Sequence, residues 1–198
     1  MIKTVEELEA IYGQPKAPSL KKVADHITAE YAAFIKASPF VALTTVGPEG
    51  LDCSPRGDNG QVVFIEDKQT LVLPDWHGNN RIDSLRNVVR DGRVSLMFLV
   101  PGSTMVVRVN GRGRISAAPD LLQRYEKSGK VPRSILLITP NEVYFQCARA
   151  IMRAGLWDGP VLVDLPSAGD ILAAMTAGDI GGKEYDKSWP ERAAKTLW

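Results

Sequence analysis

The stretch TLVLPDWHGNNRIDSLRNV, residues 70–88, joins an apolar strand directly to a helix and is the most informative part of the sequence. The strand-like run ends at Pro74 and Asp75, crosses a Gly-Asn-Asn turn and enters a helical pattern. Asn80 is a residue type that favours the N-cap position, so we expect a helix over 81–90 with Arg81 in its first turn. Such a helix start presents free backbone N–H groups and the positive end of the helix dipole.

This corner has the donors of an anion-binding site. Helix N-termini bind phosphate readily, and the guanidinium of Arg81 can add a bidentate contact. Asn79 and Asn80 can add neutral donors, and Gly78 allows close approach of the backbone. On this pattern alone, an ordinary capped helix with a solvated arginine remains an alternative.

A second corner strengthens the anion-site interpretation. CSPRGD, residues 53–58, leaves a strand with Ser54 and Arg56 close to Pro55 and Gly57. Two basic corners facing one groove would suit a phosphate monoester attached to a largely apolar ring system.

Outward from these corners, short β-branched runs alternate with turn signals. We expect strands over 40–47, 51–55, 61–66, 70–75, 93–100 and 104–116, and one or two more over 134–149. We expect helices over about 4–12, 19–37, 81–90 and 118–127, and in the tail over 168–178 and 185–198. Many strands in close succession with few helices predict a mainly β (α+β) fold, a small antiparallel barrel with helices packed outside. We expect one domain over 1–198, with N-terminal helices (about 4–37) and a C-terminal helical tail (about 165–198).

Composition excludes several classes of function. The 198 residues carry a net charge of +1, so there is no global basic field for nucleic acid or an acidic membrane surface. Apolar runs are too short to span a bilayer, and the first ten residues lack the apolar centre of a signal peptide. Cys53 and Cys147 form no disulfide framework, which favours the cytoplasm, and no zinc-ligand spacing exists.

The order of these elements resembles the pyridoxamine 5′-phosphate oxidase-like flavoproteins, the FMN-binding split-barrel family, and within it a bacterial branch of FMN-dependent enzymes. The resemblance spans about residues 30–160. The matching stretches are LDCSPRGD (51–58), TLVLPDWHGNNRIDSLRNV (70–88), RVSLMFLVPG (93–102), VVRVNGRGRIS (106–116) and EVYFQCARAIMRAGLWD (142–158). It implies a six-stranded antiparallel split β-barrel that works as a homodimer, with FMN between the subunits.

The resemblance also implies the cofactor-binding residues. They are Ser54, Arg56, Pro74, Asp75, Asn79, Asn80, Arg81 and, reaching the partner's flavin, Trp157. Asn80 stands where the family has a basic residue, which weakens the phosphate clamp unless Arg56 compensates. The arginine–histidine motif that binds substrate near the family oxidase's C-terminus is absent.

These features predict an FMN-dependent oxidoreductase acting on an unidentified small molecule, with oxygen or a nicotinamide as the other redox partner. The cofactor carries the redox chemistry in such enzymes, so no acid–base residue is required, and we assign no catalytic residue. His77 is more simply a solvated loop residue than a proton relay. A non-catalytic flavin-binding or sensing module and a barrel for another phosphorylated ligand remain alternatives.

Overall fold

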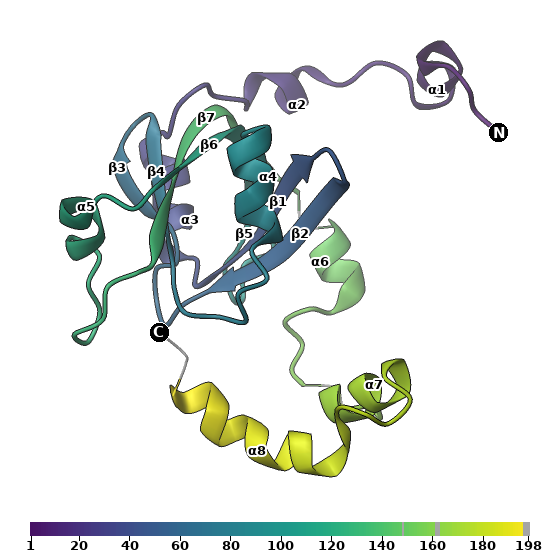
Figure 1. Cartoon of the computed structure of the whole chain (residues 1–198). Coiled ribbons are helices and arrows are strands. Elements are labelled where there is room, and N and C mark those ends of the chain that lie inside the picture. The colour runs from purple at the N-terminus through teal and green to yellow at the C-terminus, as the bar shows by residue number, and fades with distance from the viewer. Residues whose placement is uncertain (148, 161–162, 196–198) are drawn as a thin grey trace.

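Seven antiparallel strands form one sheet in the computed structural model, in the order β2-β1-β5-β6-β7-β4-β3 (Figure 1). The structure describes residues 1–147, 149–160 and 163–195. The strands are β1 (Phe40–Gly47), β2 (Gly50–Gly57), β3 (Phe64–Asp67), β4 (Thr70–Asp75), β5 (Arg93–Leu99), β6 (Val106–Ser116) and β7 (Ser134–Gln146). The helices are α1 (Val5–Tyr12), α2 (Ala17–Lys21), α3 (Ala29–Ala37), α4 (Asp83–Arg90), α5 (Pro119–Gln123), α6 (Arg149–Ala154), α7 (Ala168–Met175) and α8 (Gly182–Lys195).

The predicted fold class, an antiparallel split barrel with flanking helices, is confirmed. The sheet has seven strands, where the family resemblance implies six, and each strand-like run expected from the sequence forms one strand. The segment 134–149 contributes one long strand, β7, which pairs with β6 on one side and β4 on the other.

The sheet curls around a single apolar core. Alternation along β1 turns Val41 and Leu43 inward, where they meet Leu96 and Phe98 of β5. Ile35 of α3 and Val88 of α4 pack against the same cluster. The helix α4 therefore lies across the sheet with its start at one end of the barrel, next to the end of β4 (Figure 1).

The predicted helix over 19–37 is wrong, because the chain breaks it into α2 and α3. Between them Ala24 forms an antiparallel bridge with Val143 of β7, and the N–H of Ile27 donates to the carbonyl of Lys68. Thr28 then starts α3, its hydroxyl accepting from the N–H of Tyr31. Pairing with the sheet has overridden the helical periodicity.

Other boundaries also differ from the sequence prediction. The helix expected over 118–127 is reduced to the five residues of α5. The strand region expected over 134–149 ends at Gln146, and α6, a helix that the sequence did not predict, begins at Arg149. The tail helices are present as α7 and α8, and residues 196–198 of the predicted second helix lie outside the described residues.

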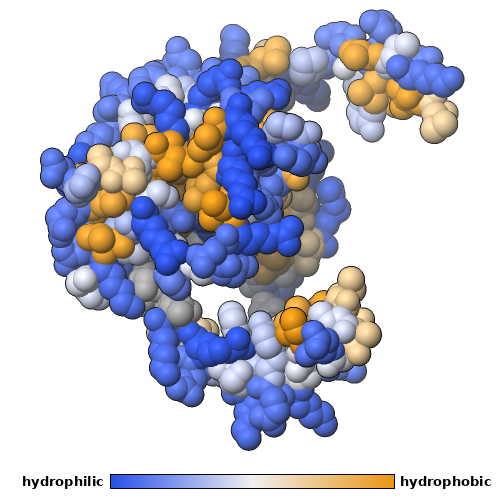
Figure 2. All heavy atoms as spheres, viewed as in Figure 1, coloured by the Kyte–Doolittle hydropathy of each residue, from blue (hydrophilic) through white to orange (hydrophobic). Residues whose placement is uncertain are grey.

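The helix α1 and the pair α7 and α8 lie apart from the barrel (Figure 1). At the N-terminus, Thr4 caps α1, its hydroxyl accepting from the N–H of Glu7. The apolar side chains Val5, Leu8, Ile11 and Tyr12 lie exposed on that helix (Figure 2). At the other end, α7 and α8 pack against each other, and the carboxylate of Asp186 accepts from Ser167 and from the N–H of Gly169. That one domain spans residues 1–198 stays a prediction.

Candidate anion-binding site

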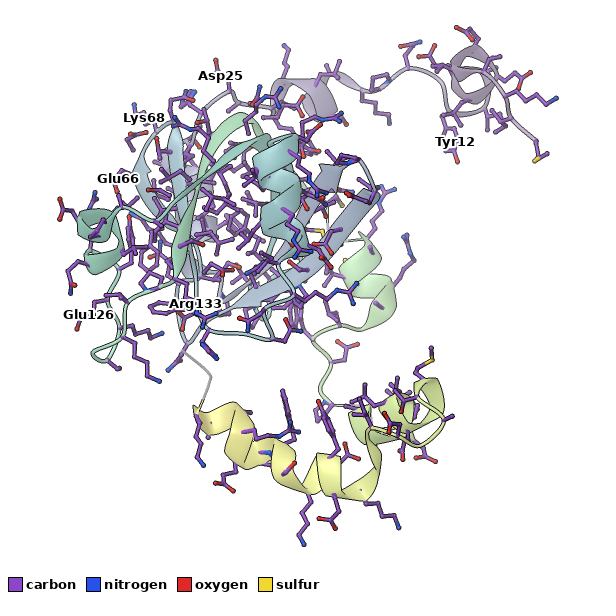
Figure 3. The ribbon with its side chains drawn as sticks, in the orientation of Figure 1. Tyr12, Asp25, Glu66, Lys68, Glu126 and Arg133 are labelled. Atoms are coloured by element: carbon purple, nitrogen blue, oxygen red, sulfur yellow. The ribbon has the colours of Figure 1, made fainter. Side chains whose placement is uncertain are left out.

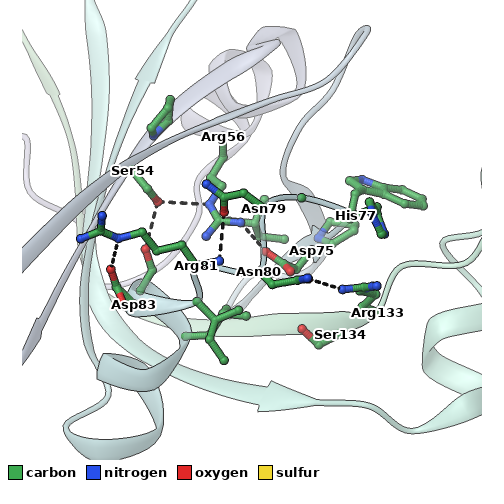
Figure 4. Close-up of a pocket in the computed structure, with 18 of the residues that line it drawn as sticks. Ser54, Arg56, Asp75, His77, Asn79, Asn80, Arg81, Asp83, Arg133 and Ser134 are labelled. Carbon is green, nitrogen blue, oxygen red and sulfur yellow. Dashed lines mark hydrogen bonds and ion pairs between the residues drawn. The ribbon is translucent and has the colours of Figure 1, made fainter. Parts of the chain in front are cut away.

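A cavity of about 520 Å³ opens at one end of the barrel, a volume within the usual range for ligand sites. The ends of β2 and β4, the loop 76–82, the start of α4 and the start of β7 line it (Figure 4). Seven of the eight predicted cofactor-binding residues lie in its wall: Ser54, Arg56, Pro74, Asp75, Asn79, Asn80 and Arg81. The two corners that the sequence singles out therefore share one cavity.

Strand alternation explains the wall that β2 contributes. Asp52, Ser54 and Arg56 are half-buried on one face of the strand, while the residues between them are exposed. The hydroxyl of Ser84 on α4, only 3% exposed, donates to the carboxylate of Asp52 and lies 3.0 Å from the Ser54 hydroxyl. These hydrogen bonds hold β2 against the first turn of α4.

Arg56 joins two strands that are far apart in the sheet order. Its guanidinium pairs with the carboxylate of Asp75, while its Nε–H donates to Ser54 at 3.2 Å. Since β2 is the first strand of the sheet and β4 the sixth, this pair can form only because the sheet curls until its margins meet. The side chains are 24% and 16% exposed, so solvent screens the pair only in part.

The corner itself differs from the sequence prediction in one respect. The helix begins at Asp83, and its N-cap is Ile82, which provides no side-chain cap. Asn80 is therefore not the N-cap, and Arg81 lies in the preceding loop rather than in the first helical turn. The side chain of Asn79 accepts from the N–H of Arg81 at 2.9 Å, and this local turn delays the start of the helix. The first N–H groups of α4 thus remain without a side-chain acceptor from the cap position.

Arg81 is highly exposed and pairs with Asp83 at 2.6 Å. This hydrogen bond raises the pKa of the Arg81 guanidinium and lowers the pKa of the Asp83 carboxyl. The pair keeps both groups charged, and because it is exposed, an incoming anion can compete for the guanidinium.

The backbone explains why asparagine occupies position 80. Asn80 has a φ of 61°, in the left-handed region, which asparagine tolerates better than most side chains. Its amide oxygen accepts from the guanidinium of Arg133 at 2.6 Å. The neutral residue at this position is thus tied to a cationic one from another part of the chain.

Trp157 is the predicted site residue that the structure does not bring to this cavity. Its indole N–H donates to the carbonyl of Ser103 at 2.7 Å, in the turn between β5 and β6. This contact fixes the segment after α6 to the turn between β5 and β6. A role toward a partner's flavin stays a prediction.

Several wall residues were not singled out from the sequence as site residues. Asp52 could have been found, because it shares the strand face of Ser54 and Arg56. Ser84 and Arg133 carried no signal, since only the folded chain brings α4 and the start of β7 to the cavity. His77 also lines the cavity, as an exposed loop residue.

Comparison with known proteins decides the family. The model of the pyridoxamine 5′-phosphate oxidase family matches residues 27–147, well over half of the chain. The chain belongs to this family. The match covers every strand and α4, and it leaves α1, α2 and the tail from α6 onward outside.

Similar solved structures confirm the split-barrel fold. HupZ of Group A Streptococcus shares 16% identity at a TM-score of 0.51, over 62% of this chain and 95% of that one. A candidate pyridoxamine 5′-phosphate oxidase from Lactobacillus delbrueckii shares 20% identity at a TM-score of 0.50, over 61% and 95%. No curated protein matches the chain.

The described residues offer neither a metal-binding cluster nor a membrane-spanning helix. Among the described residues, no group of three or more histidine, cysteine, aspartate or glutamate side chains could hold a metal ion. Within the same residues, none of the helices has the length and apolar character needed to cross a bilayer.

Proposed function

We propose that this family member binds FMN in the barrel-end cavity and acts as an FMN-dependent oxidoreductase on a small molecule. The observation that carries the proposal is the joint placement of Arg56, Arg81 and the uncapped start of α4 in one cavity. The family membership supplies the class of cofactor.

The donor set fits a phosphate monoester. Asn79, Arg81 and the first N–H groups of α4 offer a guanidinium, an amide and main-chain donors at one corner (Figure 4). Of the three carboxylates in the wall, Asp75 is held by Arg56, Asp83 by Arg81, and Asp52 by the hydroxyl of Ser84. An anion would displace Asp83 from an exposed pair, which is a small loss.

The remaining wall suits a flat, mostly apolar ring. Leu73, Pro74 and Trp76 lie on the β4 side of the cavity, with Val62 nearby. Ser54 and Arg56 face them from β2 and can donate hydrogen bonds to ring heteroatoms. Since Arg56 is already fixed by Asp75, its orientation is set before any ligand arrives.

Bound FMN would supply the redox chemistry. The chain's own residues would hold the phosphate, orient the ring and exclude water. We assign no proton donor, although His77 lies close enough to the cavity to be tested by substitution. A nicotinamide or oxygen would be the second redox partner.

We also propose a homodimer with the cofactor between the subunits. The outward-facing sides of β1, β2 and β5 carry the exposed apolar side chains Phe40, Leu51 and Met97. A second copy packed on this face would remove them from water. Light scattering on the flavin-loaded protein should give the mass of a dimer, and a monomeric species would contradict the proposal.

A purified sample tests the cofactor first. Yellow protein with absorbance near about 450 nm, or uptake of added FMN, is expected, and failure to bind FMN at any concentration would refute the proposal. Bleaching by NADH or NADPH followed by recovery in air supports turnover. Bound FMN that no reductant bleaches would instead favour a non-catalytic flavin-binding module.

A further inference from the structure

Asn80 leaves the phosphate corner with one cationic group fewer than the resemblance implies. Arg81 is the guanidinium that remains there, and it pairs with Asp83. Arg56 does not compensate, because its guanidinium lies against Asp75 across the barrel margin. A phosphate dianion at this corner would therefore meet little uncompensated positive charge from these two arginines.

Arg133 brings a third guanidinium to the same corner. It precedes β7, and its backbone N–H donates to the carbonyl of Asp75 at 2.9 Å, which fixes the chain beside the end of β4. Its side chain lines the cavity next to Asn80 (Figure 4), at the end of the barrel where Figure 3 labels it. The guanidinium donates to Asn80 at 2.6 Å.

The partners of the three arginines differ in charge. Arg56 and Arg81 each face a carboxylate, whereas Arg133 faces the neutral amide oxygen of Asn80. In the part of the chain that the structure describes, no carboxylate pairs with Arg133. Replacing a neutral acceptor by an anionic oxygen strengthens a hydrogen bond, so Arg133 gains by turning to a phosphate.

The backbone conformation at position 80 explains why an asparagine stands there while an arginine from another segment carries the charge. Position 80 is left-handed, and a long basic side chain tolerates this conformation less well than asparagine does. Asparagine therefore suits position 80, and Arg133 in the loop before β7 can supply a second positive charge at this corner. The amide oxygen of Asn80 holds the guanidinium of Arg133 at the cavity wall.

We propose that Arg133 is the second cationic ligand of a phosphate monoester at this corner and that Asn80 positions it. The proposal rests on the proposed function, because it takes the FMN phosphate to bind beside Asn79 and Arg81. It adds a residue from a distant segment to the site.

Paired titrations with FMN and riboflavin test this role, because riboflavin keeps the ring and lacks the phosphate. Arg133→Ala should weaken FMN binding roughly 10- to 100-fold and change riboflavin binding less than about threefold. Arg133→Lys should recover part of the loss, since it restores the charge without the fork. Arg124→Ala, an exposed arginine paired with Glu66, is the matched control and should change neither affinity.

The outcomes separate this proposal from the one on which it rests. If the wild-type protein binds FMN and Arg133→Ala binds it equally well, the role of Arg133 is refuted and the FMN site stands. Equal losses for FMN and riboflavin would also refute it, because they would indicate a ring or structural contact. A wild-type protein that binds neither flavin would overturn both proposals. Arg133 is exposed, so the variant should keep the wild-type urea midpoint.

Discussion

The pair between Arg56 and Asp75 should hold the two margins of the barrel together. Replacing Asp75 by alanine removes the carboxylate and leaves the guanidinium of Arg56 half-buried beside Ser54. Hydrogen bonds between charged groups contribute about 1.5–3 kcal/mol, and side chains that are 16% and 24% exposed keep most of that amount. We therefore expect Asp75→Ala to lower the free energy of unfolding by about 2 kcal/mol.

A double-mutant cycle isolates the pair. Arg56→Ala, Asp75→Ala and the double variant should give a coupling energy of about 1–2 kcal/mol in urea unfolding, with an unchanged slope. The same cycle on Glu49 and Arg90, an exposed pair at 2.6 Å, serves as control and should show no measurable coupling. A coupling below about 0.5 kcal/mol for Arg56 and Asp75 would mean that other contacts close the barrel.

Three further predictions concern single sites. Arg81→Ala should weaken FMN binding roughly tenfold or more while leaving riboflavin binding unchanged, as measured by fluorescence titration; equal affinities for FMN in both proteins would remove Arg81 from the site. The hydrogen bond from Arg93 lowers the pKa of Asp91 to about 2. The ionised carboxylate therefore stabilises the fold fully at pH values above its ordinary pKa of 3.8, and this contribution is lost as the pH falls through about 2. Asp91→Asn should remove that part of the acid limb in pH-dependent unfolding, and an Asp91 resonance that titrates in NMR at its ordinary pKa would contradict this. Gly111→Ala should lower the free energy of unfolding by about 1–3 kcal/mol, because its Cβ would lie 2.3 Å from a backbone oxygen of β7, whereas Gly78→Ala, with open space around it, should be neutral in the same urea assay.

Much of the fold was predictable because the signals were local. Turn residues separate the β-branched runs, and the alternation along β1 matches its buried and exposed sides. The helix over 19–37 failed for a non-local reason, since Ala24 pairs with Val143 more than a hundred residues away. Periodicity within a segment cannot reveal a partner strand that interrupts it.

The difference between local and non-local signals also separates the site residues that the sequence revealed from those that it did not. Arg56 and Arg81 stood out because each lies at a strand exit with polar neighbours. Arg133 did not, because its contact with Asn80 depends on the register that sets Asp75 opposite Ser134. The start of α4 was misplaced by two residues, since the left-handed conformation of Asn80 and the turn at Asn79 are tertiary features that a capping rule does not capture.

A crystal structure of the protein soaked with FMN would show whether the barrel-end cavity holds the cofactor. We expect phosphoryl density beside the side chains of Arg81 and Asn79, with the ring along Pro74 and Asp75. Density for the phosphoryl group elsewhere, or a barrel-end cavity left without flavin at saturating FMN, would contradict it.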